Sequence, residues 1–185
     1  MFMKLEELEE SIKNCNRCRL CSNRKRVLFG EGNKEADIMF IGDGPKQEEE
    51  LNKKLYSGVT GQYLIKCLEA INMEEEKIYY TNILKCKIQQ GKLLDYNEVN
   101  QCINILRNQV VIIKPKIIVL LGSSVVNNIL GKEYIFSEVC GCWIEKKDIL
   151  YMPTYHPEEF VRDNDLKLKF LQHMKLVKKK LNEIK

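Results

Sequence analysis

The apolar residues of this chain fall into short continuous runs that alternate with stretches of helical spacing. Four runs, at residues 38–41, 78–80, 117–121 and 149–152, are typical of buried strands because they are continuous and rich in β-branched or aromatic residues. Between them, apolar residues three or four positions apart predict helices over residues 3–13, 61–71, 96–113, 122–130 and 166–184.

This alternation predicts the α/β fold class, with a mainly parallel sheet of four strands that helices cover on both faces. Residues 134–152 form a less regular β region around Trp143. The chain has no internal repeat, no low-complexity segment and no change of composition that would mark a boundary. We therefore expect a single domain over residues 1–185.

Polar residues follow three of the predicted strands at the point where each strand ends. They are Asp43, Asn82 and His156, and they come from distant parts of the chain. In a parallel sheet, ligands bind outside the carboxyl ends of the strands. We therefore expect these three side chains to meet at one rim.

The composition indicates a protein that builds its core without crosslinks. The chain has 185 residues, of which 44% are hydrophobic, and a formal net charge of +4. It shows no apolar signal segment and no apolar run of about 18 residues, which favours a cytoplasmic protein that does not enter a membrane. In that compartment thiols stay reduced, so the eight cysteines are more typical of metal ligands than of disulfides.

Five cysteines form the candidate ligand group. Cys15, Cys18 and Cys21 lie within one turn, and Cys86 and Cys102 are the other two. Four thiolates suit either a tetrahedral zinc ion or an iron–sulfur cluster, and spacing alone does not choose between them.

The remaining three cysteines have other interpretations. Cys67 lies on the apolar stripe of a predicted helix, which favours a place in the core. Cys140 and Cys142 have no evident partner pair nearby, so we interpret them as structural or incidental.

Basic residues are concentrated around the first cysteines. This stretch suits a polyanionic partner, or it offsets the negative charge of a thiolate-ligated cluster. The residues are Arg17, Arg19, Arg24, Lys25 and Arg26.

Several motifs, taken in order, resemble the family 4 uracil-DNA glycosylases over residues 14–162. Short pieces such as Gly61-Gln62 or His156-Pro157 are weak by themselves, but their order and spacing together with the cysteines are specific. The motifs are Cys15-x2-Cys18, Phe29-Gly30-Glu31-Gly32-Asn33, Gly42-Asp43-Gly44-Pro45, Gly61-Gln62, Thr81-Asn82-Ile83-Leu84-Lys85-Cys86, Cys102 and His156-Pro157.

The resemblance implies a three-layer αβα sandwich that repairs DNA by excising uracil, without a lyase step. It also implies a structural [4Fe–4S] cluster held by Cys15, Cys18, Cys86 and Cys102, with Cys21 left over. We expect this cluster to lie away from the residues assigned to chemistry. Uracil-containing DNA is the expected partner, and a monomer is the expected state.

The resemblance also assigns roles at the predicted rim. Asn82 resembles the residue that reads the Watson–Crick edge of the flipped base, and Tyr56 stands where an aromatic ring stacks on it. His156 would stabilise the negative charge that develops on uracil O2. Asp43 would hold the attacking water, while the backbone at Gly44 contacts the pyrimidine.

Three residues depart from the family pattern. Asp43 stands where the family has a longer glutamate, Lys46 replaces a glycine, and Glu158 replaces a small residue that contacts the DNA backbone. A proline-rich loop expected after Cys86 is replaced by residues 87–92. These departures motivate a rival hypothesis, a nucleic-acid-binding protein without catalytic activity, and a zinc-stapled interaction module is a second rival.

The segment after His156 offers candidate DNA contacts. Phe160 or Val161 would supply an apolar wedge that fills the space of the flipped base, and Arg162 would contact a phosphate. In the alternative interpretation, Phe160 packs beneath the C-terminal helix.

Overall fold

The computed structural model describes residues 3–89, 91 and 93–184, and it contains one six-stranded sheet with the order β1-β3-β2-β4-β6-β5. Gln90 and Lys92, in the loop that replaces the expected proline-rich segment, lie outside the described residues. The strands are β1 (Glu31–Gly32), β2 (Ile38–Gly42), β3 (Ile78–Asn82), β4 (Ile117–Leu121), β5 (Ile144–Lys146) and β6 (Ile149–Thr154).

The predicted α/β class is confirmed, but the predicted count of four strands is wrong. The four predicted strands, β3, β2, β4 and β6, form the parallel centre of the sheet. Two short strands extend it, because β1 pairs antiparallel with β3 and β5 pairs antiparallel with β6. Strand β5 lies within the less regular β region predicted over residues 134–152, where the short helix Phe136–Val139 was not expected. Strand β1, with two residues, is too short to leave an apolar pattern.

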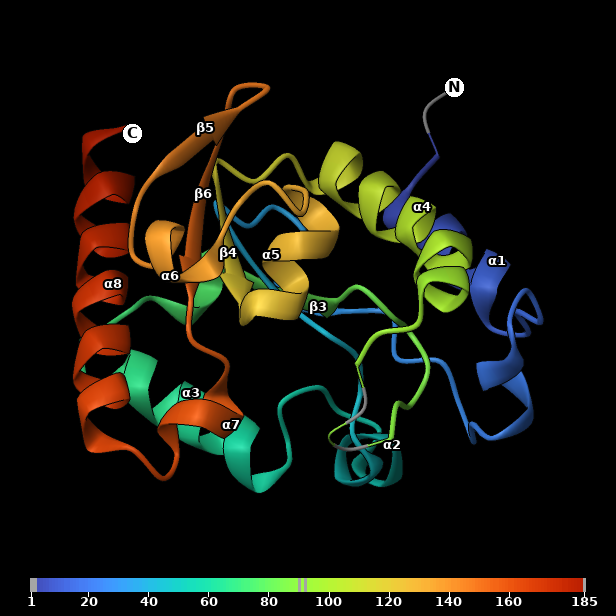
Figure 1. The fold of residues 1–185 in the computed structure, drawn as a ribbon. Helices are drawn as coiled ribbons and strands as arrows, with labels where there is room; N and C mark the ends of the chain where they lie inside the picture. The colour runs from blue at the N-terminus through green and yellow to red at the C-terminus, as the bar shows by residue number, and fades with distance from the viewer. Residues whose placement is uncertain (1–2, 90, 92, 185) are drawn as a thin grey trace.

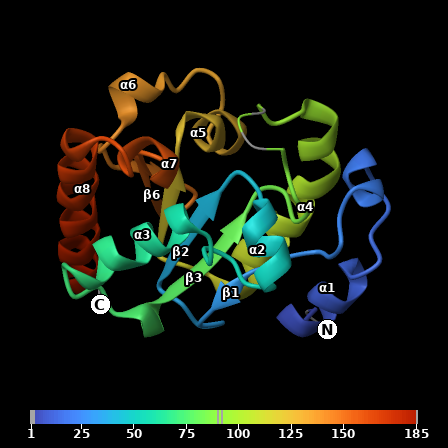
Figure 2. The ribbon, with the colours of Figure 1, turned by 90° about the horizontal axis from the view of Figure 1, so that it is seen from below.

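Helices cover both faces of the sheet (Figures 1 and 2). Apolar side chains of α1, α4 and α5 pack on one face, and those of α3, α7 and α8 pack on the other. The helices are α1 (Leu5–Ile12), α2 (Gln47–Asn52), α3 (Val59–Glu69), α4 (Tyr96–Ile113), α5 (Ser123–Ile129), α6 (Phe136–Val139), α7 (Pro157–Phe160) and α8 (Asn164–Glu183), with short 3₁₀ turns at Arg19–Ser22 and Glu75–Lys77.

Capping residues explain where the two long helices begin. The Asp95 carboxylate accepts hydrogen bonds from the first backbone amides of α4, and Asp163 does the same for α8. The Asp163 cap starts α8 at Asn164, two residues before the apolar periodicity begins. No helix in the described part of the chain has the length and apolar character needed to cross a membrane.

Candidate active site and cysteine pocket

The carboxyl ends of the parallel strands bring the three predicted polar residues to one rim. Asn82 is the last residue of β3 and stands in register with Gly42, the last residue of β2. Asp43 follows Gly42 directly, and His156 lies two residues after β6. The expectation that these side chains share one edge of the sheet is therefore confirmed.

Asn82 and Tyr56 lie against the backbone of Gly42. The Asn82 side chain is almost fully buried, with 4% of the residue exposed. A Cβ atom on Gly42 would lie 2.5 Å from Asn82 Oδ1 and 3.0 Å from the Tyr56 hydroxyl oxygen, so a side chain is excluded at this position. The glycine at the end of β2 thus makes room for both groups. The next glycine, Gly44, is also buried.

Tyr56 is held in a conformation that few residues adopt. Its φ angle is 53°, in the left-handed region, and its backbone amide donates a hydrogen bond to the buried Glu49 carboxylate. Glu49 also accepts a hydrogen bond of 2.7 Å from the Lys46 amide. A Cβ atom on Gly61 would lie 2.3 Å from Tyr56 Cα, so α3 approaches this backbone closely. The surroundings therefore fix the ring position despite the backbone strain.

Asp43 has one buried carboxylate oxygen, Oδ1, without a hydrogen-bond partner among the described residues. Burial raises the pKa of this carboxyl group, whereas the nearby Lys46 ammonium and a hydrogen bond with Ser124 lower it. An unpartnered buried oxygen at the rim is a suitable acceptor for a water molecule or a ligand donor.

His156 is oriented by the first turn of α7. Its Nδ1 atom accepts a hydrogen bond of 3.2 Å from the Glu158 amide, and its own amide donates to Glu159 Oε2 over 2.6 Å. Burial lowers the pKa of the imidazole to about 4, so the ring is neutral at pH 7. Because Nδ1 is an acceptor, the proton of the neutral ring resides on Nε2, which is thereby a donor.

Phe160 does not occupy a surface position. It is 1% exposed, and its ring stacks on Phe170 of α8 with a centroid distance of 4.5 Å. The expectation of a wedge is therefore wrong for Phe160, because its ring is part of the core beneath the C-terminal helix. Val161 is partly exposed and Arg162 is exposed, so both can contact a partner.

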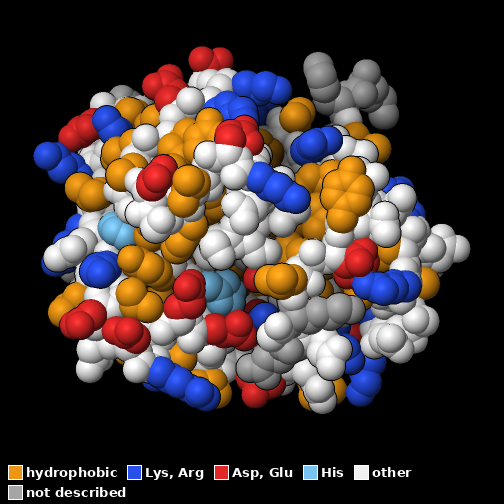
Figure 3. All heavy atoms as spheres, in the orientation of Figure 1, with side chains coloured by type: hydrophobic (Ala, Val, Ile, Leu, Met, Phe, Trp, Pro, Cys, Tyr) orange, Lys and Arg blue, Asp and Glu red, His pale blue; other side chains and the backbone are white. Residues whose placement is uncertain are grey.

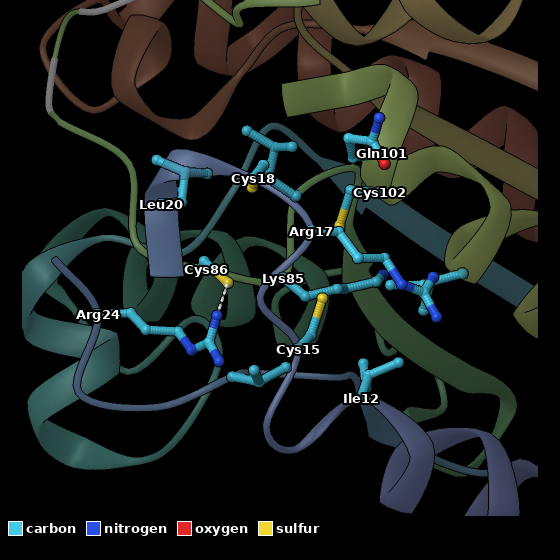
Figure 4. Close-up of a pocket in the computed structure, with 13 residues that line it drawn as sticks. Ile12, Cys15, Arg17, Cys18, Leu20, Arg24, Lys85, Cys86, Gln101 and Cys102 are labelled. Atoms are coloured by element: carbon cyan, nitrogen blue, oxygen red, sulfur yellow. Dashed lines mark hydrogen bonds between the residues drawn. The ribbon is translucent and has the colours of Figure 1, made fainter. Parts of the chain in front are cut away.

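Four cysteines line one pocket between the N-terminal segment, the end of β3 and α4. They are Cys15, Cys18, Cys86 and Cys102, whereas Cys21 is not among the lining residues. Figure 4 shows the four sulfur atoms around a common space. Among the described residues, no group of three or more His, Cys, Asp or Glu side chains is already placed to hold a metal ion.

The surroundings of the cysteine pocket are partly basic. Burial raises the pKa of the Cys86 thiol to about 11, and the Arg24 guanidinium opposes this effect. Arg24 Nη1 donates to Cys86 Sγ over 3.5 Å. Positive charge beside a thiol favours the thiolate form that ligates metals. Arg19 instead forms an ion pair with Glu98 at 2.6 Å, so these two arginines already have partners within the chain.

A buried lysine connects the cysteine pocket to the rim. Lys85 also lines the pocket, is 1% exposed, and donates hydrogen bonds of 2.6 Å to the Asn82 carbonyl, Thr81 Oγ1 and Gln109 Oε1. None of the four rim residues lines the cysteine pocket, but Lys85, which precedes Cys86, holds the backbone of Asn82.

Sequence reasoning missed three side chains that support the rim: Glu49, Lys85 and Ser124. Ser124 had a signal, because two serines follow a buried strand and the adjacent Gly122. Lys85 also had a signal in the sequence, because it is a charged residue inside an apolar segment. Glu49 had none, since it stands in a run of glutamates that is typical of an exposed helix.

Acidic and basic side chains are intermingled on the face seen in Figure 3. No broad area of this face carries charge of a single sign.

Comparison with known proteins shows which proteins this chain resembles. Residues 29–182 match the model of the uracil DNA glycosylase superfamily. The chain is similar to a type-4 uracil-DNA glycosylase of Thermotoga maritima, with 31% identity over 169 residues that cover 89% of this chain and 87% of the relative. Similar proteins of the same name occur in Saccharolobus solfataricus, with 32% identity over 83% of this chain and 75% of the relative, and in Sulfurisphaera tokodaii, with 30% identity over 83% and 74%.

Proposed function

Because this chain belongs to the uracil-DNA glycosylase superfamily, and within it resembles the type-4 enzymes over most of its length, we propose that it excises uracil from DNA by hydrolysing the N-glycosidic bond. The observation that carries the proposal is the convergence of Asn82, Tyr56, Asp43 and His156 at one rim of the sheet. The products are free uracil and an abasic site.

The base is recognised by Asn82 and Tyr56 after the nucleotide has rotated out of the duplex. The Asn82 amide offers both an acceptor and a donor, which match N3–H and O4 of uracil. Tyr56 presents its ring for stacking, which contributes about 1–3 kcal/mol per base. The close packing of both groups against Gly42 supports side chains that are held in place before the base arrives.

Bond cleavage depends on His156 and Asp43. As the glycosidic bond breaks, negative charge develops on the uracil ring, and the Nε2 proton of the neutral imidazole donates to O2. The acceptor role of Nδ1 toward the Glu158 amide supports this tautomer. The unpartnered Oδ1 of Asp43 accepts a hydrogen bond from the attacking water.

The four cysteines of the pocket suit a [4Fe–4S] cluster. Four thiols from two distant parts of the chain line one pocket, and Arg24 supplies positive charge beside Cys86, which favours the thiolate form. Such a cluster would fasten the N-terminal segment to the end of β3 and to α4. Its contribution is structural, and excision itself depends on the residues of the rim.

The test is an excision assay with the cluster-loaded protein and oligonucleotides that contain one uracil, in single and double strands. We expect alkali-labile sites at uracil and none at cytosine. Asn82→Ala and His156→Ala should each slow excision by about 100-fold or more. Asn104→Ala removes an asparagine from the exposed face of α4 and serves as the control. Tight binding of uracil-containing DNA without base release would instead support a non-catalytic binding protein.

A further inference from the structure

Two residues that depart from the family pattern lie against each other. Lys46 Nζ is 3.4 Å from Glu158 Oε1, and the two side chains are only 23% and 31% exposed. An ion pair that is partly removed from water is less screened than one on an open surface. The two departures are thus physically coupled, and each compensates the charge of the other.

The ion pair joins the two loops that carry the proposed chemistry. Lys46 stands three residues after Asp43 and precedes α2, while Glu158 stands two residues after His156 in α7. Figure 1 shows α2 and α7 at the same end of the molecule, in its lower part. The pair therefore spans from the end of β2 to the end of β6 across the rim.

Glu158 also contacts the imidazole directly. Its amide donates to His156 Nδ1 over 3.2 Å, and its Oε2 atom lies 3.6 Å from the same nitrogen. The Glu158 amide thus holds the neutral imidazole, while the Glu158 carboxylate, which lies beside the same nitrogen, takes its positive partner from Lys46.

We propose, on the basis of the glycosylase function above, that the Lys46–Glu158 pair positions His156 and cancels the charge of Glu158 beside the base pocket. Both members are positioning residues, because they act through His156 and through the loop of Asp43. The pair takes the place of the glycine and the small residue that the family pattern has at these positions.

The charges around His156 and Asp43 support this role. The charged groups near the two residues are Lys46, Glu158 and Glu159. Lys46 lowers the pKa of both Asp43 and His156, and Glu158 raises both. Loss of Lys46 alone should therefore raise both pKa values, and loss of Glu158 alone should lower both. With the pair intact the two effects oppose each other.

The pair also bears on DNA binding. A carboxylate at the position of Glu158 repels a DNA phosphate, and the Lys46 ammonium offsets this repulsion. Lys46→Met should therefore weaken DNA binding more than the removal of a lysine elsewhere. Lys116→Met is the matched control, because Lys116 pairs with Asp37 at 3.0 Å near the opposite ends of the strands.

The experiment compares Lys46→Met, Glu158→Gln, the double variant and the charge swap Lys46→Glu/Glu158→Lys. The titration of His156 is followed by NMR, which is practicable because the chain has two histidines and a His173→Gln variant assigns the signals. Excision in a single turnover is measured over the same pH range. Lys46→Met should move the His156 midpoint and the acid limb of the rate to higher pH, and Glu158→Gln should move both to lower pH.

In the double variant and the charge swap, the titration and the rate should return toward those of the wild type. Lys46→Met alone should slow excision near pH 4 by about two- to threefold, whereas Lys116→Met should leave the rate and the His156 titration unchanged. A double variant whose His156 midpoint and rate stay as far from the wild type as those of either single variant would overturn the proposal, as would an unchanged His156 midpoint in both single variants. The titration does not depend on glycosylase activity, so a wild type without excision would contradict the function and not the ion pair.

Discussion

At the scale of single residues, the rim was predictable where a side chain follows a strand. Asp43, Asn82 and His156 could be assigned to one edge because parallel strands end together. His173 could not be interpreted in this way. Its Nδ1 lies 2.9 Å from Thr154 Oγ1, and its ring stacks on Tyr155. Such contacts between distant segments leave no signal in local spacing.

The buried imidazole of His156 should make the stability of the protein depend on pH. Burial lowers the pKa of His156 from 6.5 to about 4, so the unfolded chain binds a proton more readily than the folded one. The stability that this neutral ring contributes is present above pH 6.5 and is lost as the pH falls toward 4. The His156→Gln variant lacks this titrating group. Between pH 7 and pH 4, its free energy of unfolding in urea should therefore fall by about 2–3 kcal/mol less than that of the wild type.

The control for this measurement is His173→Gln. Burial also lowers the pKa of His173, but this ring is less enclosed, so a smaller change is expected. Identical pH dependence in the wild type and in His156→Gln would contradict the account of a buried neutral ring.

At the scale of secondary-structure elements, the sequence predicted the long helices, the four central strands and a β region that contains β5, but not β1 or α6. The central strands β2, β3 and β4 are buried along their whole length, which gives a continuous apolar run. Strands β1 and β5 and helix α6 are short and partly exposed, so their conformations depend on neighbouring elements. Helix α7 is also short, and its role was left open between the core and the DNA surface.

Variants of α7 and the residues after it separate these two roles. Phe160→Ala should lower the free energy of unfolding by about 3–5 kcal/mol, because it removes a ring stacked on Phe170. Arg162→Ala should change stability by less than about 0.5 kcal/mol, because the side chain is exposed. It should also weaken DNA binding and reduce the dependence of binding on salt. A stable Phe160→Ala protein with a specific defect in DNA binding would restore the wedge hypothesis.

At the scale of the whole molecule, four cysteines from the N-terminal segment, the segment after β3 and α4 line one pocket. The sequence indicated a four-cysteine site but did not choose between zinc and an iron–sulfur cluster. The structure brings together the four cysteines that the resemblance implied and leaves Cys21 outside the pocket. It also adds a connection that spacing could not reveal, through Lys85 to the backbone of Asn82.

Serine substitutions test the identity and the ligands of this site. Cys102→Ser should abolish the brown colour, the broad visible absorbance and the iron content of the purified protein, since it removes one of four thiolates. Cys21→Ser is the matched control and should retain all three. Colourless wild-type protein that contains stoichiometric zinc would contradict the iron–sulfur assignment, and loss of iron in Cys21→Ser would contradict the assigned ligands.

The central claim is that the rim formed by Asn82, Tyr56, Asp43 and His156 catalyses excision in addition to binding DNA. Its most direct test is to quantify free uracil by mass spectrometry after a single turnover, with cluster-loaded protein in excess over uracil-containing DNA. The account predicts one uracil released per DNA molecule, with the abasic strand intact until alkali is added. Complete binding of the DNA with its uracil still attached would contradict the account.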